Sequence, residues 1–268
     1  MKFFFQAFFK GLYFFLTDKH FRKFAWLVLR YGRSRRYERR TVRLAGRRIQ
    51  VADVKSYVWQ FYEIFFKGYY DFHTSAERPV ILDCGANIGI SAIHFKQQYP
   101  LADIHAFEPD PEICLLLKDN LASAGWNDVH VYNQAVWVRN EELDFASEGA
   151  DGGKISQEGS GNKKIAAIDL AGFMAAFDHI HFLKIDIEGA ETSVLPHIAS
   201  ELRKVDNLFV EFHSYNEQPQ HLHEVIQAIS SCGHRIYIDN IHFKNTPFVN
   251  RKGKYGMDLQ LNIFAYKP

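Results

Sequence analysis

The chain has 268 residues, of which 47% are hydrophobic, 24% charged and 15% aromatic. This composition excludes a disordered or collagen-like chain, because apolar residues are abundant and Gly and Pro number only 17 and 8. The length suits one large domain, or one domain with an extension. Three cysteines without a CxxC pair support neither a disulfide framework nor a cysteine-ligated zinc site. A reducing compartment, the cytoplasm, is the simplest expectation.

The net charge of +1 conceals a strong asymmetry along the chain. Residues 1–48 contain 14 of the 32 Lys and Arg residues and only two acidic residues. The remaining 220 residues carry 18 basic and 29 acidic residues. Averaging these two regions hides their opposite charges, which indicate different electrostatic roles. We therefore expect a basic, aromatic-rich helical extension at 1–48 and a separate domain at 49–268.

The extension begins with an apolar segment from Phe3 to Leu16, interrupted by Gln6 and Lys10. It is shorter than the roughly 18 to 20 residues that span a bilayer. The internal Lys10 and the absence of a small-x-small cleavage site argue against a secretory signal. Three interpretations remain: binding to an anionic membrane at its inner face, a helical cap on the main domain, or nucleic-acid binding. The aromatic residues lie apart from the basic run, which makes nucleic-acid binding the weakest of the three.

From residue 49 the chain alternates between short apolar strands and helical segments. Strands are expected at 49–54, 80–82, 103–107, 129–133, 181–185, 208–212, 235–239 and 259–266, and helices at 57–66, 90–98, 111–124, 190–199 and 218–231. The polar, Gly-rich stretch 147–161 is expected to be a flexible hairpin near an acceptor site. This alternation predicts an α/β fold with a mainly parallel sheet and helices on both faces. Ligands of such sheets bind beyond the C-terminal strand ends.

The first buried strand ends in a glycine-rich turn, DCGANIG, that leads into a helix. Gly85 and Gly89 permit a close backbone approach to a ligand, and Asn87 is tolerant of positive φ. Glu108 ends the next strand, where a carboxylate can accept hydrogen bonds from both ribose hydroxyls of a nucleoside. Asp83 would repel a pyrophosphate but attract an amino group. The turn therefore favours a nucleoside with a cationic amino-acid arm over a dinucleotide.

Four runs along the chain, LDCGANIG, AFEPDP, LKIDIEGAE and VEFH, resemble the FkbM family of S-adenosylmethionine-dependent methyltransferases. The resemblance covers roughly residues 60–240, and DIEGAE is its most specific part. It implies the class I methyltransferase fold, which is Rossmann-like, with a seven-stranded sheet whose last strand is antiparallel. It also implies methyl transfer to an oxygen, often a sugar hydroxyl of a natural product or a surface glycan.

The resemblance assigns S-adenosylmethionine to the glycine-rich turn. It implies that Asp83, Gly85 and Gly89 border the methionine part and that Glu108 binds the ribose. The positions that would contact adenine follow the third strand: Asn133, Gln134 and Ala135. Asn87 replaces a glycine of the broader class but is a usual residue in this family, in the form DxGxNxG.

Candidate catalytic residues follow the fourth and fifth parallel strands. Asp186 ends one strand beside the expected cofactor, and Glu211 and His213 lie on one side of the next. A sugar hydroxyl is a poor nucleophile until its proton begins to leave, so a base or a metal is expected. The three residues form either a base set, with His213 oriented by a carboxylate, or a divalent metal site.

Two nearby groups have packing explanations beside functional ones. Glu188, Gly189 and Glu191 open a helix, where acidic residues favour the helix dipole, so a structural role is expected for Glu191. Tyr69 and Tyr70 form either part of a lid or sugar-stacking wall, or part of the core.

The sequence as a whole predicts an S-adenosylmethionine-dependent O-methyltransferase acting on a saccharide in a glycan, glycolipid or natural product. Another small-molecule hydroxyl is the alternative acceptor. A nucleic acid is less expected, because the Asn-Pro-Pro-Tyr type of sequence found in base methyltransferases is absent after the fourth strand. A non-catalytic membrane adaptor that retains a nucleoside pocket is the alternative outside the enzymes.

Overall fold

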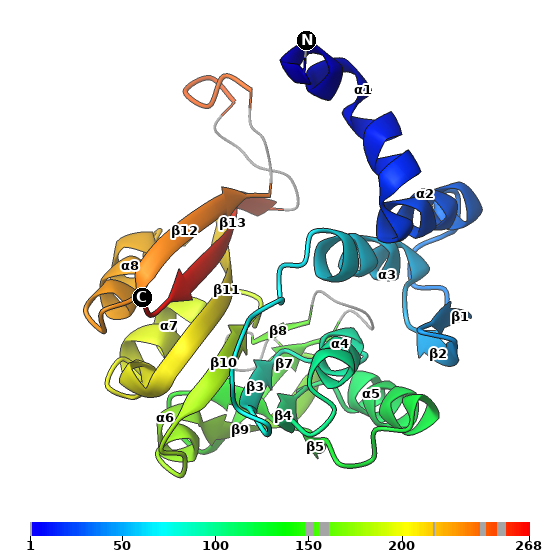
Figure 1. Cartoon of the computed structure of the whole chain (residues 1–268). Coiled ribbons are helices and arrows are strands. Elements are labelled where there is room, and N and C mark those ends of the chain that lie inside the picture. The colour runs from blue at the N-terminus through cyan, green and yellow to red at the C-terminus, as the bar shows by residue number, and fades with distance from the viewer. Residues whose placement is uncertain (1, 148–152, 156–160, 217, 242–244, 251–255) are drawn as a thin grey trace.

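The computed structural model describes residues 2–147, 153–155, 161–216, 218–241, 245–250 and 256–268, with side chains from residue 9 onward. A central sheet lies between two groups of helices, and two further helices extend from it at the N-terminus (Figure 1). None of the helices in these ranges combines the length and the apolar character needed to cross a membrane.

The central sheet has seven strands in the order β12-β13-β11-β10-β3-β4-β5. Their bounds are β3 (Val80–Cys84), β4 (Asp103–Phe107), β5 (His130–Tyr132), β10 (Ile180–Ile185), β11 (Val205–Tyr215), β12 (Arg235–Asn240) and β13 (Met257–Tyr266). The five strands from β11 to β5 are parallel, and β13 runs antiparallel to both β11 and β12. The expected class I topology, with an antiparallel last strand, is confirmed.

Both faces of the sheet are buried, because consecutive residues of each strand point to opposite sides. Ile81 faces the core formed with α4 and α5, whereas Leu82 faces the core formed with α6, α7 and α8. The bounds of these helices are α4 (Ile90–Gln98), α5 (Pro111–Ala124), α6 (Leu170–Met174), α7 (Glu191–His197) and α8 (Leu222–Ser230). A short 3₁₀ turn, η2 (Glu201–Lys204), leads into β11. This burial on both faces explains why the sequences of the parallel strands are almost continuously apolar.

The N-terminal region differs in part from the expectation. Helices α1 (Lys2–Thr17) and α2 (Lys19–Tyr31) are followed by an antiparallel hairpin of β1 (Arg40–Leu44) and β2 (Arg47–Val51). The expected helical extension at 1–48 therefore ends in a β-hairpin, because residue 48 lies within β2. The strand expected at 49–54 also ends earlier, at Val51. Asp53 accepts a hydrogen bond from the amide of Lys55 and thereby begins α3 (Val54–Phe61), which continues as the π-helical turn η1 (Tyr62–Phe66).

A second sheet, absent from the sequence-based prediction, follows the third parallel strand. It has the order β6-β9-β7-β8, with β6 (Ala135–Trp137), β7 (Glu141–Ala146), β8 (Lys154–Ile155) and β9 (Lys163–Asp169). Its small core, which includes Phe145 and Ile165, forms only when these distant segments pair. Most of the predicted hairpin at 147–161 lies outside the described residues; within it, β8 pairs with the end of β7.

Candidate active site

A cavity of about 770 Å³ lies at the C-terminal ends of the parallel strands. Its walls come from the β3–α4 turn, the ends of β4, β10 and β11, the α3–η1 segment, and the ends of β12 and β13. Its lining contains seven acidic and three basic side chains: Glu63, Glu108, Asp110, Asp186, Glu188, Glu211 and Asp239, with Arg36, Lys67 and Lys184. Acidic side chains thus outnumber basic ones on this wall, which suits cationic or neutral ligands better than anionic ones.

The β3–α4 turn brings its backbone against the neighbouring strand end. Gly85 has a φ of +83°, and a Cβ there would lie 1.8 Å from the carbonyl oxygen of Asp186. Asn87 also has a positive φ, +48°, which Asn tolerates better than most residues. Gly89, at a φ of +88°, begins α4 against the side chain of Leu117. The turn therefore requires the glycine at position 85 for reasons of packing as well as conformation.

Glu108 is buried at the mouth of this turn and holds two backbone amides. Its carboxylate accepts hydrogen bonds from the amides of Asn87 and Asp110, both at 2.9 Å. Burial raises the pKa of Glu108 to about 8, although these two hydrogen bonds act in the opposite direction. Each carboxylate oxygen keeps a lone pair for a further donor, which suits the two hydroxyls of a ribose.

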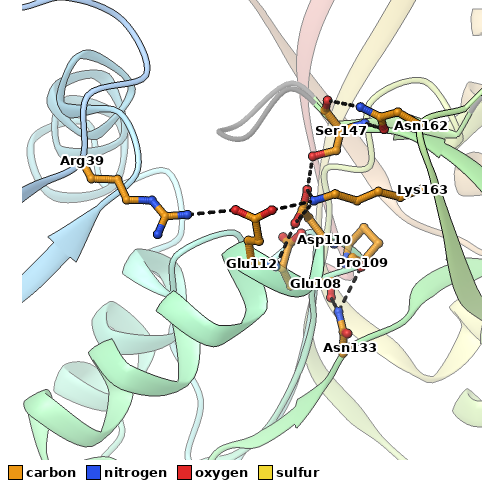
Figure 2. Close-up of polar contacts among 9 residues, drawn as sticks. All are labelled: Arg39, Glu108, Pro109, Asp110, Glu112, Asn133, Ser147, Asn162 and Lys163. Atoms are coloured by element: carbon orange, nitrogen blue, oxygen red, sulfur yellow. Dashed lines mark hydrogen bonds and ion pairs between the residues drawn. The ribbon is translucent and has the colours of Figure 1, made fainter.

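A polar network holds the loop after Glu108 in place (Figure 2). Asp110 begins α5 by accepting from the amide of Glu112, and it also accepts from Ser147 and, at 3.1 Å, from Lys163. Glu112 in turn pairs with Lys163 and with Arg39 of the N-terminal region. The second sheet and the N-terminal region thus both fasten this loop.

The predicted cofactor residues separate into those on the cavity wall and those behind it. The wall includes Gly85, Asn87, Glu108, Gln134, Ala135 and Asp186. Asp83, Gly89 and Asn133 are not among the lining residues of this cavity. Asp83 is fully buried and accepts from Ser91, while Asn133 donates to the carbonyl oxygens of Glu108 and Pro109 (Figure 2). These residues support the loops that form the wall.

Lys184 is the buried cation beneath this wall. Its Nζ donates to the carbonyl oxygen of Gly85 at 2.8 Å and lies 3.2 Å from Asp186 and 3.5 Å from Asp83. Burial opposes its charge, but the two carboxylates outweigh burial and raise the pKa of Lys184 above its ordinary value. One ammonium group therefore joins the glycine turn to the end of β10.

His213 lies among carboxylates and is only 3% exposed. Its Nδ1 is 3.2 Å from Glu191, and its Nε2 is 3.6 Å from Glu211 and 3.7 Å from Glu188. Burial would lower its pKa, but Glu191 and Glu211 outweigh burial and raise the pKa well above its ordinary value. His213 lines a smaller, separate cavity of about 200 Å³ and is not among the lining residues of the main one. At neutral pH its ring is therefore a buried cation behind the carboxylates.

The carboxylates of the main cavity have unequal proton affinities. Burial raises the pKa of Asp186 to about 6 and that of Glu188 to about 8. Burial also acts to raise the pKa of Glu211, but the hydrogen bond and charge of His213 outweigh it and leave that pKa below its ordinary value. At neutral pH Glu211 is ionised, and Asp186 is a carboxylate with increased basicity. A base works best when its pKa is close to the working pH.

Asp186, Glu211 and His213 each present one ligand atom within 4.8 Å of the others. Two carboxylates and an imidazole are a suitable donor set for a divalent transition metal. A metal ligand must be an unprotonated imidazole, whereas the contact with Glu191 favours the protonated ring of His213. Lys184 already neutralises Asp186. The arrangement fits a hydrogen-bonded charge cluster better than a metal centre.

Glu191 and the segment before it explain how this cluster is held. Glu191 is fully buried and accepts from the amides of Ile187 and Gly189, at 3.0 and 2.9 Å. It thereby supports Glu188 in the left-handed region, at a φ of +54°, where a non-glycine residue is strained. Tyr69 and Tyr70 both line the cavity; Tyr70 is also buried in the aromatic core, and Tyr69 donates to Asp239.

Sequence reasoning missed the wall contributed by α3 and η1. Ser56, Gln60 and Glu63 all line the cavity from this segment. Burial, with Glu211 and Asp186 nearby, raises the pKa of Glu63 to about 8. The available signal was a single acidic residue in an otherwise apolar, aromatic helix, FYEIFF. Its direction depends on the π-helical turn, which the sequence does not reveal.

Comparison with known proteins places these features in one family. The model of the methyltransferase FkbM domain matches residues 83–236. The chain is 25% identical over 155 residues to the 2-O-methyltransferase NoeI of Sinorhizobium fredii (strain NBRC 101917 / NGR234), covering 50% of this chain and 63% of NoeI. It is 45% identical over 60 residues to the methyltransferase sdnD of Sordaria araneosa, which covers 22% of this chain and 23% of sdnD.

A solved structure shows the same fold. The methyltransferase FkbM of Methylobacillus flagellatus KT is similar with a TM-score of 0.52 at 15% identity, over 80% of this chain and 52% of that one. The chain thus spans less than two thirds of NoeI and sdnD, and about half of the FkbM protein. The family model covers more than half of this chain and contains the glycine turn, Glu108, Asp186 and His213, so the chain belongs to the FkbM methyltransferase family.

Proposed function

We propose that this protein is an S-adenosylmethionine-dependent O-methyltransferase whose acceptor is a sugar hydroxyl. The observation that carries the proposal is the position of Asp186 and Glu211 on the wall of the same cavity as Glu108 and the β3–α4 turn. A nucleoside subsite and a proton acceptor thus share one cavity. The similarity to a 2-O-methyltransferase supports oxygen as the methylated atom.

The cavity fits S-adenosylmethionine in charge and shape. Its acidic lining suits a sulfonium ion and an ammonium group, and Glu108 offers acceptors for the ribose hydroxyls. The absence of a Cβ at Gly85 keeps the turn close to the end of β10. Gln134 and Ala135 would border the adenine. When bound, the cofactor supplies an electrophilic methyl carbon, and positioning of the acceptor accounts for much of the rate.

The protein must accept a proton from the acceptor hydroxyl. Asp186 is suited to this role because it lines the cavity and its pKa, about 6, lies close to neutrality. Glu211 is ionised beside it, and the Glu211 charge contributes to raising the pKa of Asp186. His213, as an imidazolium outside the main cavity, stabilises the ionised carboxylates. We therefore assign the base role in the trio Asp186, Glu211 and His213 to Asp186.

The acidic wall also bears on the class of acceptor. Nucleic acids present a phosphate at every nucleotide and are usually met by Lys and Arg. The lining of this cavity offers only three basic side chains to such a backbone, against seven acidic ones. A neutral acceptor that carries hydroxyl groups fits better, and saccharides are the class with the highest density of hydroxyls.

Calorimetric titration tests whether the protein binds S-adenosylmethionine. An absence of binding would contradict the methyltransferase proposal and favour a non-catalytic adaptor. Mass spectrometry of glycans and glycolipids from cells lacking the gene tests the acceptor. We expect one sugar to lose the mass of a methyl group. Intact methylation of all sugars, together with cofactor binding, would favour another small-molecule hydroxyl.

The N-terminal helices have both a packed side and an exposed side. Phe14, Phe21 and Phe24 contact the aromatic residues of η1, and Leu27 is buried, so part of the region is a cap on the domain. The exposed side is also apolar: Leu12, Tyr13, Phe15, Leu16, Trp26 and Leu29 are all more than half exposed or close to it. The many basic residues nearby complement anionic lipid. We propose that this side lies on the inner, cytoplasmic face of a membrane.

A further inference from the structure

We propose that the α3–η1 wall is the acceptor subsite, and that Ser56, Gln60 and Glu63 bind adjacent hydroxyls of one sugar ring. This inference rests on the proposed methylation of a saccharide and specifies where the sugar lies. It assigns a role to a wall of the cavity that comes from a different part of the chain than the glycine turn, Glu108, Asp186 and Glu211, which line the same cavity.

The three residues form a polar stripe on a segment that is otherwise apolar. Ser56 and Gln60 are one helical turn apart, and Glu63 follows in η1; all three line the cavity. Tyr62 and Ile64 on either side of Glu63 also line the cavity, so Glu63 is the acidic group on an apolar part of this wall, whereas Phe66 packs on Phe21. A π-helical turn adds a residue to the helix and is often found at functional sites. Here it leaves Glu63 on the cavity side.

Two polar atoms of the stripe lack partners. Ser56 is only 9% exposed, and its Oγ is buried without a hydrogen bond to any residue that the structure describes. The same holds, among those residues, for Oε1 of Gln60. A buried polar atom without a partner costs about 1–3 kcal/mol, so such atoms are rare unless a ligand or water satisfies them. Both residues belong to the cavity lining, so a small rotation of either side chain would bring its unpaired oxygen to a ligand in the cavity.

The chemistry of the stripe selects hydroxyl groups. Oε1 of Gln60 accepts hydrogen bonds, and the hydroxyl of Ser56 and the carboxyl of Glu63 can each donate and accept, so the ligand groups that fit are those that do both, as a sugar hydroxyl does. Trp59 lies on the same wall, is 59% exposed, and offers a flat aromatic face for the C–H groups of a sugar ring. Tyr69, in the turn after η1, also lines the cavity and donates to Asp239 of β12 at 2.7 Å. The wall therefore offers an aromatic surface for the apolar face of a sugar ring and polar groups for its hydroxyls.

Saturation-transfer NMR tests the subsite directly. The probes are the methyl glycosides of glucose, galactose, mannose, fucose and rhamnose, at millimolar concentration, with the full chain alone and loaded with S-adenosylhomocysteine. We expect at least one glycoside to bind the loaded protein. S56A, Q60L and E63Q should each weaken that binding at least tenfold and leave the affinity for S-adenosylhomocysteine within about twofold.

Q227L, an equivalent change at an exposed position on α8, serves as the control and should bind like the wild type. The subsite is wrong if no glycoside binds, if S56A and Q60L bind glycosides normally, or if these variants lose the cofactor instead. Thermal melts distinguish a folding defect from a loss of glycoside binding. If one variant is unfolded, the other two test the subsite. A wild type that binds glycosides but not S-adenosylhomocysteine would instead contradict the proposed methyl transfer.

Discussion

Nδ1 of His213 lies 3.2 Å from Oε1 of Glu191, and both side chains are fully or almost fully buried. This contact fixes the role of each residue. Glu191 favours the charged ring of His213 and simultaneously accepts from two amides of the segment that contains Glu188. The charge of His213 then keeps Glu211 ionised on the cavity wall. His213, which the sequence suggested as a base, therefore acts as a positively charged group beside the carboxylates.

Replacement of Glu191 by alanine should destabilise the protein by about 3–5 kcal/mol, because it leaves a buried imidazolium and two amides without their acceptor. In a chain of this size, that is a fall in melting temperature on the order of 10 °C. Thermal denaturation measures it, with E142A, at an exposed position on β7, as the control. A fall of less than about 2 °C would show that the contact contributes little.

Replacement of Asp186 by asparagine should reduce kcat about 10²–10⁴-fold, the usual contribution of a general base. Methyl transfer to the identified acceptor is the measurement, with D119N, at an exposed position on α5, as the control. For the wild type, kcat should fall as the pH drops below about 6, where Asp186 becomes protonated. If H213A loses activity and D186N does not, the base assignment must return to the histidine.

Replacement of Glu108 by glutamine should weaken S-adenosylmethionine binding about 10–100-fold, since one of the two oxygens that would accept from the ribose hydroxyls becomes an NH₂ group that cannot accept. Calorimetric titration gives the Kd directly. E112Q is a matched control, because Glu112 lies in the same network but not on the cavity wall (Figure 2). Equal affinities for E108Q and E112Q would remove Glu108 from the nucleoside subsite.

The free energy of unfolding should fall as the pH rises from about 5 to about 8. Glu63, Glu108 and Glu188 have a pKa near 8 in the folded chain against 4.5 in the unfolded chain, so the folded state holds more protons in this window. The stabilisation from His213, whose pKa is also raised, decreases in the same direction. Urea denaturation at several pH values measures this loss as a decrease in the free energy of unfolding at each higher pH.

In E63Q this loss should be smaller, because one of the titrating carboxyls is removed. A free energy of unfolding that rises between pH 5 and pH 8 would contradict the assignment of these raised pKa values.

The double variant L16E/L29E should weaken binding to liposomes that contain anionic lipid at least tenfold. These positions are 69% and 87% exposed, so the change leaves the packed side of the two helices intact. Co-sedimentation measures binding, and L115E on α5, where the leucine is 62% exposed, is the matched control. Absence of liposome binding by the wild type at low ionic strength would exclude the membrane surface and leave only the cap.

The sequence by itself determined the succession of strands and helices along the domain and the residues at the strand ends, whereas the structure gave the order of the strands in the sheet. The strand from Val80, the turn at Gly85 and Glu108 are recognisable because a buried strand, a left-handed turn and a following helix are encoded by neighbouring residues. The hairpin β1–β2 and the second sheet escaped prediction, since they depend on pairing between segments with weak local signals, such as β9 with β7.

Only the tertiary structure decided the chemical state of the cluster and the second wall of the cavity. His213 becomes a cation because Glu191, 22 residues earlier in the chain, is buried against it. Ser56, Gln60 and Glu63 reach the cavity because α3 and η1 pack across the strand ends. Proton affinity and unpaired hydrogen-bonding atoms both depend on which groups burial brings together, and that is a property of the packed molecule.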